Sequence, residues 1–320
     1  MTGVEGIAAI REGRTVDPAP AIRPRLVSVA SGKGGVGKTM ICLGVAWYLA
    51  RMGYRVVAVD VDFGVGNLHL SAGLGRVDRS LDEFFSGSTD DLGQLAIPVA
   101  DNGRLSILAA GGRCSAVTDM PEPRMRALLE RIRGIDADYV LLDIGAGSSQ
   151  SNVECFVQAH HRIGVTTGDL SSMAALTALM RKARVQAVLR QVMQVFPQAL
   201  YLSRHGYASI SAVFAAISDQ DDAGVVLPVA ETAAKNFDSV IILNRARDAD
   251  VGQIQRINSS LGRHINTDRG VSGIIPEDDA VNECRRRGLN FLSTMPSCGA
   301  ARALAKVTHE WHQASTVLCN

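Results

Sequence analysis

A glycine-rich segment near the start of the chain combines two lysines and a threonine at a spacing that suits phosphate binding. Residues 32–39 read G-K-G-G-V-G-K-T and fit the pattern G-x-x-x-x-G-K-[ST]. Glycines let backbone N–H groups converge on phosphate oxygens, and the N-terminus of a following helix adds partial positive charge. We expect Lys38 to contact the β- and γ-phosphates of a nucleotide and the Thr39 hydroxyl to ligate Mg²⁺. The predicted nucleotide contacts here are Gly32, Gly34, Gly35, Val36, Gly37, Lys38, Thr39 and Met40.

Three aspartates stand at the ends of two apolar segments and could complete a metal–phosphate site. Asp60 and Asp62 lie at the end of segment 55–61, and Asp143 directly follows segment 139–142. Alternation along a strand places Asp60 and Asp62 on the same side, at the carboxyl end where open α/β sheets bind ligands. Asp143 is the acid expected to hold Mg²⁺, directly or through water. The alternative for Asp60 and Asp62 is an ordinary role in a helix cap or a turn.

Short apolar segments alternate with helical patterns along the chain and predict the framework that positions these groups. The segments are continuously apolar, which is typical of a parallel sheet covered by helices on both faces. We therefore predict an α/β fold with a doubly wound, mainly parallel sheet, the fold of P-loop NTPases. Strands are expected over residues 26–30, 55–61, 105–109, 139–142, 163–166, 239–243 and 271–275, and helices over 40–52, 124–133, 172–195, 250–261 and 279–287.

One stretch, residues 185–236, does not follow this alternation. It carries mostly helical patterns and is far longer than a usual connection between a strand and a helix. We interpret it as a helical insertion at the edge of the core; the alternative is ordinary core helices with a strand at 224–229. Residues 1–24 are expected to form a tail, 25–315 a single P-loop ATPase domain, and 316–320 a second tail.

The composition limits the classes of function. The chain has 320 residues, with 33 Lys and Arg against 32 Asp and Glu, so its net charge is +1. A charge near zero argues against an electrostatic grip on nucleic acid along the whole chain. No apolar run reaches the roughly 18 residues of a transmembrane helix, and the first 25 residues lack the apolar core of a secretory signal. The six scattered cysteines include no C-x-x-C pair, so free thiols in a reducing cytoplasm are expected.

The segments that carry these groups resemble a known family. The form K-G-G-V-G-K-T at 33–39 resembles the deviant Walker A box of the MinD/ParA superfamily of ATPases. D-V-D-F-G-V-G-N at 60–67 is similar to the first switch of that family. Y-V-L-L-D-I-G-A-G at 139–147 is similar to its Walker B strand and to the second switch of its flagellar branch, FlhG (FleN). The resemblance runs from about residue 25 to residue 311, except for 185–236.

This resemblance implies roles for individual residues. Lys33 would reach across to the nucleotide of a partner subunit, so that ATP binding would produce a homodimer. Asp62 would polarise the attacking water, and Asp60 would support the Mg²⁺ shell. A backbone N–H near Gly145 would sense the γ-phosphate.

Weaker motifs later in the chain imply a pocket for the base. Asn244 stands where the family has an asparagine that contacts adenine. The loop that follows the last strand would close over the base with Pro276, Glu277 and Asp278.

The sequence also departs from the family pattern. The usual T-P-E-P-T-S reads T-G-D-L-S-S at 167–172, which leaves the path of that loop open. The glutamine-containing N-terminal motif of FlhG proteins is not recognisable in residues 1–24. The flagellar assignment therefore rests on fewer residues than the ATPase assignment.

The sequence predicts an Mg²⁺–ATP-dependent ATPase of the MinD/FlhG type. ATP and ADP would switch it between dimer and monomer as a spatial or number regulator in flagellar placement or cell division. One alternative is a ParA-like, DNA-associated positioning ATPase that uses the basic clusters at 181–184 and 285–287. Another is a slow regulatory module that binds a protein partner through residues 185–236.

The end of the chain raises the question of membrane contact. Residues 302–311 predict a helix with Leu304, Val307 and Trp311 on one face. MinD and FlhG proteins use such a helix to bind lipid. This one carries two basic residues, so it would need the avidity of a dimer. The alternative is a terminal helix packed on its own domain. We expect a cytoplasmic protein, with peripheral contact at the inner face of the cell membrane as a further option.

Overall fold

The computed structural model describes residues 24–63, 66–99, 103–111, 120–204, 206–221, 224–252, 254–255, 258–259 and 270–317. Most of both predicted tails, the end of the predicted helix over 250–261, and Gly64 and Val65 of the first-switch motif lie outside the described residues. Within the described ranges, no helix has both the length and the apolar character needed to span a membrane.

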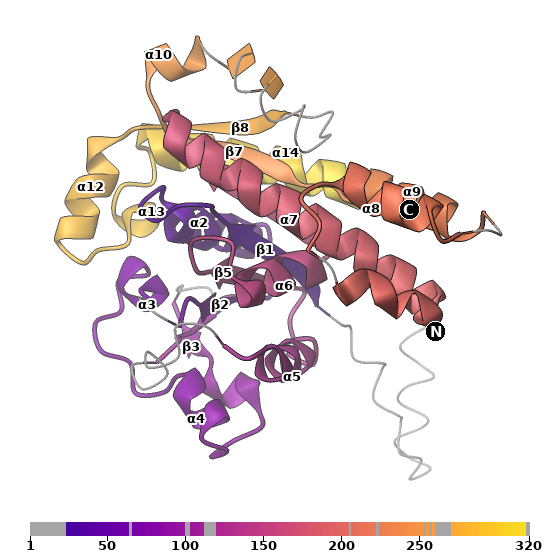
Figure 1. Ribbon diagram of the computed structural model, residues 1–320. Helices are drawn as coiled ribbons and strands as arrows, with labels where there is room; N and C mark the ends of the chain where they lie inside the picture. Colours follow the sequence, from indigo (N-terminus) through magenta and orange to yellow (C-terminus); the bar gives the residue numbers. More distant parts are fainter. Residues whose placement is uncertain are drawn as a thin grey trace, which may run out of the picture.

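A sheet of eight strands, counted over the described residues, forms the centre of the molecule (Figure 1). Its order is β3-β4-β2-β5-β1-β6-β7-β8, so β1 lies between β5 and β6. The pairings are parallel except for the edge pair of β3 and β4. The strands are β1 (Arg25–Ala30), β2 (Val56–Val61), β3 (Ile97–Pro98), β4 (Leu105–Leu108), β5 (Tyr139–Ile144), β6 (His161–Thr166), β7 (Val240–Ala246) and β8 (Val271–Pro276).

Helices cover both faces of this sheet (Figure 1), which confirms the predicted doubly wound α/β fold. Short 3₁₀ helices occur at Leu92–Leu95 and Pro197–Arg204. The α-helices are α2 (Lys38–Arg51), α3 (Leu68–Ser71), α4 (Leu81–Phe85), α5 (Glu122–Ile132), α6 (Gln150–Gln158), α7 (Leu170–Val195), α8 (Ile210–Ser218), α9 (Val226–Asn236), α10 (Asp248–Val251), α12 (Asp279–Arg286), α13 (Phe291–Thr294) and α14 (Gly299–Val317).

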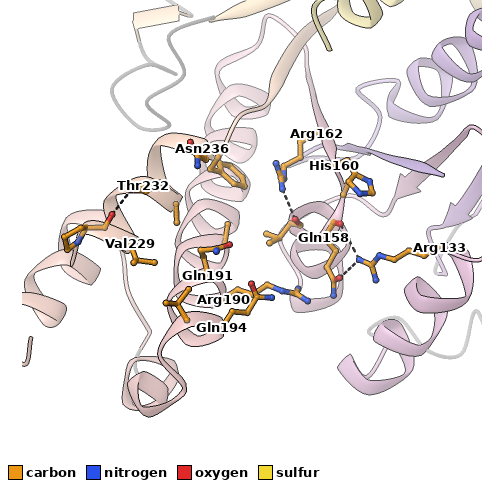
Figure 2. A pocket seen from close by; sticks show the side chains of 17 residues that line it. Arg133, Gln158, His160, Arg162, Arg190, Gln191, Gln194, Val229, Thr232 and Asn236 are labelled. Carbon is orange, nitrogen blue, oxygen red and sulfur yellow. Dashed lines mark hydrogen bonds between the residues drawn. The ribbon is translucent and has the colours of Figure 1, made fainter. Parts of the chain in front are cut away.

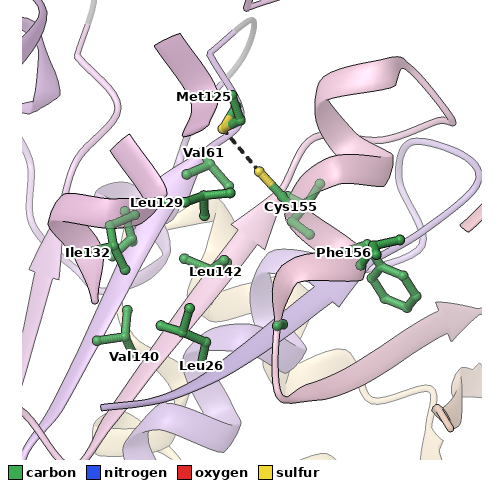
Figure 3. Close-up of a cluster of buried hydrophobic side chains, with 14 of the residues drawn as sticks. Leu26, Val61, Met125, Leu129, Ile132, Val140, Leu142, Cys155 and Phe156 are labelled. Atoms are coloured by element: carbon green, nitrogen blue, oxygen red, sulfur yellow. Dashed lines mark hydrogen bonds between the residues drawn. The ribbon is translucent and has the colours of Figure 1, made fainter. Parts of the chain in front are cut away.

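Successive side chains of the central strand enter two different hydrophobic cores. Leu26 of β1 belongs to a core with α5, α6 and α7, and its neighbour Val27 belongs to the core with α2 and α14. Figure 3 shows part of the first core, where the thiol of Cys155 lies 3.1 Å from the sulfur of Met125. Burial raises the pKa of the Cys155 thiol, so this cysteine is an uncharged core residue. The sheet that carries the predicted site is therefore fixed from both sides.

The described part of the stretch between β6 and β7 is mostly helical. The N-terminal half of α7 packs on the sheet through Leu176 and Met180, whereas Val188 and Val192 belong to a third core with α8 and α9. The change of packing partner falls near residue 185, where we place the start of the insertion. The alternative of a strand at 224–229 is wrong, because α9 begins at Val226. The division of the chain into tail, domain and insertion stays a prediction.

The terminal helix α14 is packed on the domain. The side chains of Leu304, Val307 and Trp311 are 0%, 7% and 8% exposed. Leu304 fits over Gly44 of α2, and the Trp311 ring lies 5.4 Å from that of His161. The packed alternative is therefore confirmed, and the apolar face that was considered for lipid contact is used inside the fold.

Candidate functional site

The loop after β1 leads directly into α2 at the carboxyl ends of the parallel strands. Gly37 has a φ of 88°, a left-handed conformation that favours glycine. Gly32 must be small, because a Cβ there would collide with the backbone of α7 at Ala175. The N–H groups in the first turn of α2, which starts at Lys38, have no acceptors within the helix. These donors and the helix dipole suit phosphate oxygens.

A cavity of about 420 Å³ opens over the start of α2. It brings together the predicted phosphate loop, Asp62 from the end of β2, and the second-switch segment after β5. This is the arrangement that the motifs predict for binding a nucleoside triphosphate. The cavity is lined by Ser31, Gly34, Gly35, Gly37, Lys38, Thr39, Met40, Asp62, Asn67, Ser71, Ala146 and Arg285.

Lys38 and Asp143 form a buried ion pair at this edge. The Lys38 Nζ donates to Asp143 Oδ1 over 2.7 Å, and the two side chains are 8% and 1% exposed. Burial by itself would lower the pKa of Lys38, but the charge and hydrogen bond of Asp143 outweigh burial and raise it. Burial raises the pKa of Asp143 overall, whereas Lys38 and the Thr39 side chain act to lower it. Lys38 is therefore held in its charged form. A bound phosphate could replace Asp143 as the partner of Lys38, and a metal could then bind to Asp143.

Asp60 and Asp62 have different surroundings despite their shared motif. Asp60 is fully buried, and its carboxylate accepts the N–H of Leu68 at 3.0 Å and that of Asp62 at 3.1 Å. Burial, and then the charge of Asp143, raise the pKa of Asp60 to about 7. Asp62 lines the cavity, and a Cβ built on Gly145 would lie 3.4 Å from its Oδ1. The structure thus brings Asp62 and Gly145 together and gives Asp60 the contacts of a turn-stabilising residue beside the proposed metal ligands.

Lys33 is half exposed and contacts its own chain. Its Nζ donates to Ser171 Oγ over 2.7 Å and lies 3.9 Å from Asp169 Oδ1. Asp169 caps the N-terminus of α7 by accepting the N–H of Ser172 at 2.9 Å. Hydrogen bonds, the largest from Ser171 and the next from Thr167, hold the pKa of Asp169 below its ordinary range. These contacts give the path of the loop at 167–172, which the sequence left open.

Asn244 lies at the end of β7 and is 1% exposed. Its Nδ2 donates to the Val36 carbonyl of the phosphate loop over 2.7 Å. Its Oδ1 is buried and has no hydrogen-bond partner among the residues that the structure describes. A free acceptor of this kind can take the 6-amino group of adenine. The amide borders a second cavity, of about 110 Å³, that also touches Gly37, Met40 and Pro276.

The carboxylates of the predicted base loop are held by neighbouring groups. Glu277 pairs with Arg247 at 2.6 Å and with Arg245 at 3.1 Å. Asp278 accepts the N–H groups of Ala280 and Ala300, each at 3.0 Å. These contacts position the loop beside Pro276. We did not predict Arg245 and Arg247, because a lone arginine after a strand gives no sign of its partner. Arg285 was predicted only as part of a surface patch.

A larger cavity, of about 920 Å³, lies at the opposite, amino-terminal ends of the strands, before the first residues of β6 and β7 (Figure 2). Its arginines are already bound within the chain. Arg133 donates to Gln158, Arg162 donates to the Val157 carbonyl, and Arg190 pairs with the buried Glu154. None of the site residues predicted from the sequence lines this cavity, so the candidate nucleotide site remains the cavity at the start of α2.

Comparisons with known proteins match the family and the fold of this chain. A family model described as the CobQ/CobB/MinD/ParA nucleotide binding domain matches residues 27–291. A putative septum site-determining protein MinD of Oltmannsiellopsis viridis is 36% identical over 151 residues, which are 47% of each chain. The chain spans about half the length of the curated relatives it matches.

Two solved structures share the fold over most of the chain. The septum site-determining protein MinD complexed with Mg-ADP, from Pyrococcus horikoshii OT3, has a TM-score of 0.60 and 20% identity. The comparison covers 92% of this chain and 98% of that one. The MinC:MinD cell division protein complex from Aquifex aeolicus has a TM-score of 0.57 and 17% identity, over 90% of this chain and 96% of that one. At these identities the likeness shows the fold alone.

Proposed function

The chain belongs to the CobQ/CobB/MinD/ParA nucleotide-binding family, and from this premise we propose that it is an Mg²⁺-dependent ATPase that forms a homodimer when ATP binds. The observation that carries the proposal is the cavity in which Lys38, Thr39 and Asp62 meet at the N-terminus of α2. The unpaired Oδ1 of Asn244, free of partners within the described part of the chain, gives the adjoining cavity a preference for adenine.

In this proposal the phosphates displace the ion pair at the start of α2. Lys38 and the first-turn N–H groups bind the β- and γ-phosphates, which releases Asp143 from Lys38. Asp143 and the Thr39 hydroxyl would hold Mg²⁺, which would neutralise phosphate charge when bound. Within the described ranges no group of three or more His, Cys, Asp or Glu side chains could hold a metal. An ion held by Asp143 and Thr39 would take its remaining ligands from phosphate and water.

Hydrolysis is proposed to depend on Asp62. This carboxylate lines the cavity beside Gly145 and opposite the loop glycines. In this proposal it orients a water molecule and accepts its proton as the water attacks the γ-phosphate. The buried Asp60 fixes the turn by accepting the N–H of Asp62, so we assign it to positioning Asp62 and supporting the metal ligands.

The dimer is proposed to use Lys33. In the single chain its ammonium is bound to Ser171 and lies near Asp169, at the exposed end of α7. The next residue, Leu170, is 81% exposed, so a large apolar side chain stands beside the lysine. A second copy facing this edge would cover Leu170, and Lys33 would exchange Ser171 for the phosphates of the other subunit. The contact with Ser171 keeps the lysine ordered before that exchange.

The process that the switch serves is proposed from the family. We propose a MinD- or FlhG-type regulator of cell-division or flagellar position, cytoplasmic, that binds a protein partner. A solved MinD complex with MinC supports the partner in general terms. Protein is favoured over DNA because two of the basic side chains at 181–184 are engaged: Lys182 donates to the Ser148 carbonyl and Arg184 to that of Ala234. Membrane contact would have to use residues other than the packed face of α14.

The direct test is the molecular mass with different nucleotides. Asp62→Ala should bind ATP without hydrolysing it, so light scattering should give twice the subunit mass with Mg²⁺–ATP and the monomer mass with Mg²⁺–ADP. Lys38→Ala should stay monomeric with both nucleotides because it loses nucleotide binding. An Asp62→Ala protein that binds ATP and stays monomeric would contradict the dimer.

A further inference from the structure

The two cavities of the proposed nucleotide site share part of their walls. Met40 and Arg285 border both the cavity of about 420 Å³ at the phosphate loop and the cavity of about 110 Å³ at Asn244. A nucleotide with its phosphates in the first cavity and its base in the second must pass this shared wall. The part of the nucleotide that lies between terminal phosphates and base is the ribose with its α-phosphate. Arg285 would therefore lie beside the α-phosphate of a nucleotide bound in this way.

Among the residues that the structure describes, none forms an ion pair with Arg285. Its side chain is exposed, and within the described ranges it makes no ion pair or side-chain hydrogen bond. The neighbouring Arg286 pairs with Glu283 at 3.0 Å, and Arg245 and Arg247 share Glu277. Arg285 thus differs from the arginines around it, because it borders the nucleotide cavities and lacks an anionic partner there.

The helix that carries Arg285 is anchored against the core. Cys284, the preceding residue, is 2% exposed and packs in the hydrophobic core with α2. Asp278 caps the start of α12 by accepting the N–H of Ala280, and its other oxygen accepts that of Ala300 at the start of α14. These contacts fix the start of α12, and Arg285 lines the same two cavities as Met40 in the first turn of α2.

We propose that Arg285 is a nucleotide-binding residue whose guanidinium binds the α-phosphate of ADP and ATP. The planar guanidinium offers two parallel N–H donors that match phosphate oxygens. This inference rests on the proposed function, because it names a further contact in the same site. It reassigns to the nucleotide an arginine that the sequence grouped with a DNA-binding patch. Because both nucleotides carry the α-phosphate, Arg285 contributes equally to the binding of each and is not required for the hydrolytic step.

The test compares equilibrium binding of ADP and of ATP to wild type, Arg285→Ala and Arg285→Lys. We expect Arg285→Ala to weaken the binding of both nucleotides by roughly tenfold, which corresponds to about 1.4 kcal/mol of binding free energy. Arg285→Lys should recover part of the loss, since it keeps the charge but not the paired donors. Added salt should narrow the difference between wild type and Arg285→Ala, because the contact is exposed.

Arg286→Ala is the matched control, since it removes a neighbouring exposed arginine of the same helix. It should bind both nucleotides within twofold of wild type, and all variants should unfold at the same temperature without nucleotide. Unchanged ADP binding by Arg285→Ala would overturn the inference, and so would a loss confined to ATP, which would place the contact at the γ-phosphate. If wild type binds neither nucleotide, the proposed function fails and this inference fails with it.

Discussion

The substitution Asn244→Ala removes a buried amide that has two separate roles. Its Nδ2 holds the Val36 carbonyl of the phosphate loop at 2.7 Å, and its Oδ1 has no hydrogen-bond partner in the described part of the chain. In the proposed complex Oδ1 accepts the 6-amino group of adenine. Guanine carries an acceptor oxygen at this position, so it would face Oδ1 with like partial charge. Wild type should therefore prefer ATP to GTP, and the alanine variant should lose that preference.

The structure sets the size of both effects. Loss of the bond to Val36 removes one net hydrogen bond, about 0.5–1.5 kcal/mol of folding free energy, and should lower the melting temperature by about 1–6 °C. A base contact of this kind is worth about 1–3 kcal/mol of discrimination, roughly 5- to 150-fold between ATP and GTP. In Asn244→Ala the ratio of GTP to ATP dissociation constants should fall to near one, mostly through weaker ATP binding.

Calorimetric titration with ATP and GTP, each with Mg²⁺, measures the ratio directly. Asn236→Ala is the matched control, because it makes the same substitution at an exposed amide at the opposite edge of the sheet. Its ratio should equal that of wild type. If Asn244→Ala folds and keeps the wild-type ratio, the base does not lie against Asn244 and the second cavity is not the adenine site.

Three further outcomes follow from the contacts. Lys33→Ala should bind ATP with wild-type affinity but stay monomeric by light scattering, and ATP-dependent dimers of this variant that still hydrolyse ATP would exclude the crossing role. Gly44→Ala should cost about 1–3 kcal/mol in urea unfolding, because the new Cβ overlaps Leu304. Adding Leu304→Ala should then cost less than the sum of the two single changes, and strict additivity would contradict this packing. The stability should fall as the pH drops from about 6.5 to about 4, because burial, then His160, Arg25 and Arg162, lower the pKa of His161 to about 4. The unfolded chain binds more protons than the folded chain over that pH range. His161→Phe should therefore reduce the fall of the urea unfolding midpoint with decreasing pH. If the midpoint of His161→Phe falls as steeply as that of wild type, other groups cause the fall.

Much of the fold could be predicted because its strands are continuously apolar and bounded by clear turns. Leu26 to Ala30 and Tyr139 to Leu142 are buried on both faces, which is the pattern that marks a central parallel strand. The two-residue strand β3 was missed because Ile97 and Pro98 are too few to show a period. The stretch 185–236 was correctly predicted as mostly helical, but its separate core became visible only in three dimensions.

The site was predictable where a backbone requirement fixes the residue type. The phosphate loop needs glycine at position 37 for its left-handed turn and a lysine directly at the helix start, so the motif and the geometry coincide. Side-chain partners were not predictable in this way. The pairing of Glu277 with Arg245 and Arg247 depends on the relative position of two strand ends. The same holds for Arg285, which borders the cavity through the packing of a late helix.

In the proposed function, the cavity at the start of α2 hydrolyses ATP through Asp62. The decisive experiment compares phosphate release from Mg²⁺–ATP by wild type and by Asp62→Ala, both at ATP concentrations shown to saturate binding. We expect slow release by wild type and none above background by Asp62→Ala. Release by Asp62→Ala at the wild-type rate, or no release by a wild type that binds ATP and dimerises, would contradict it.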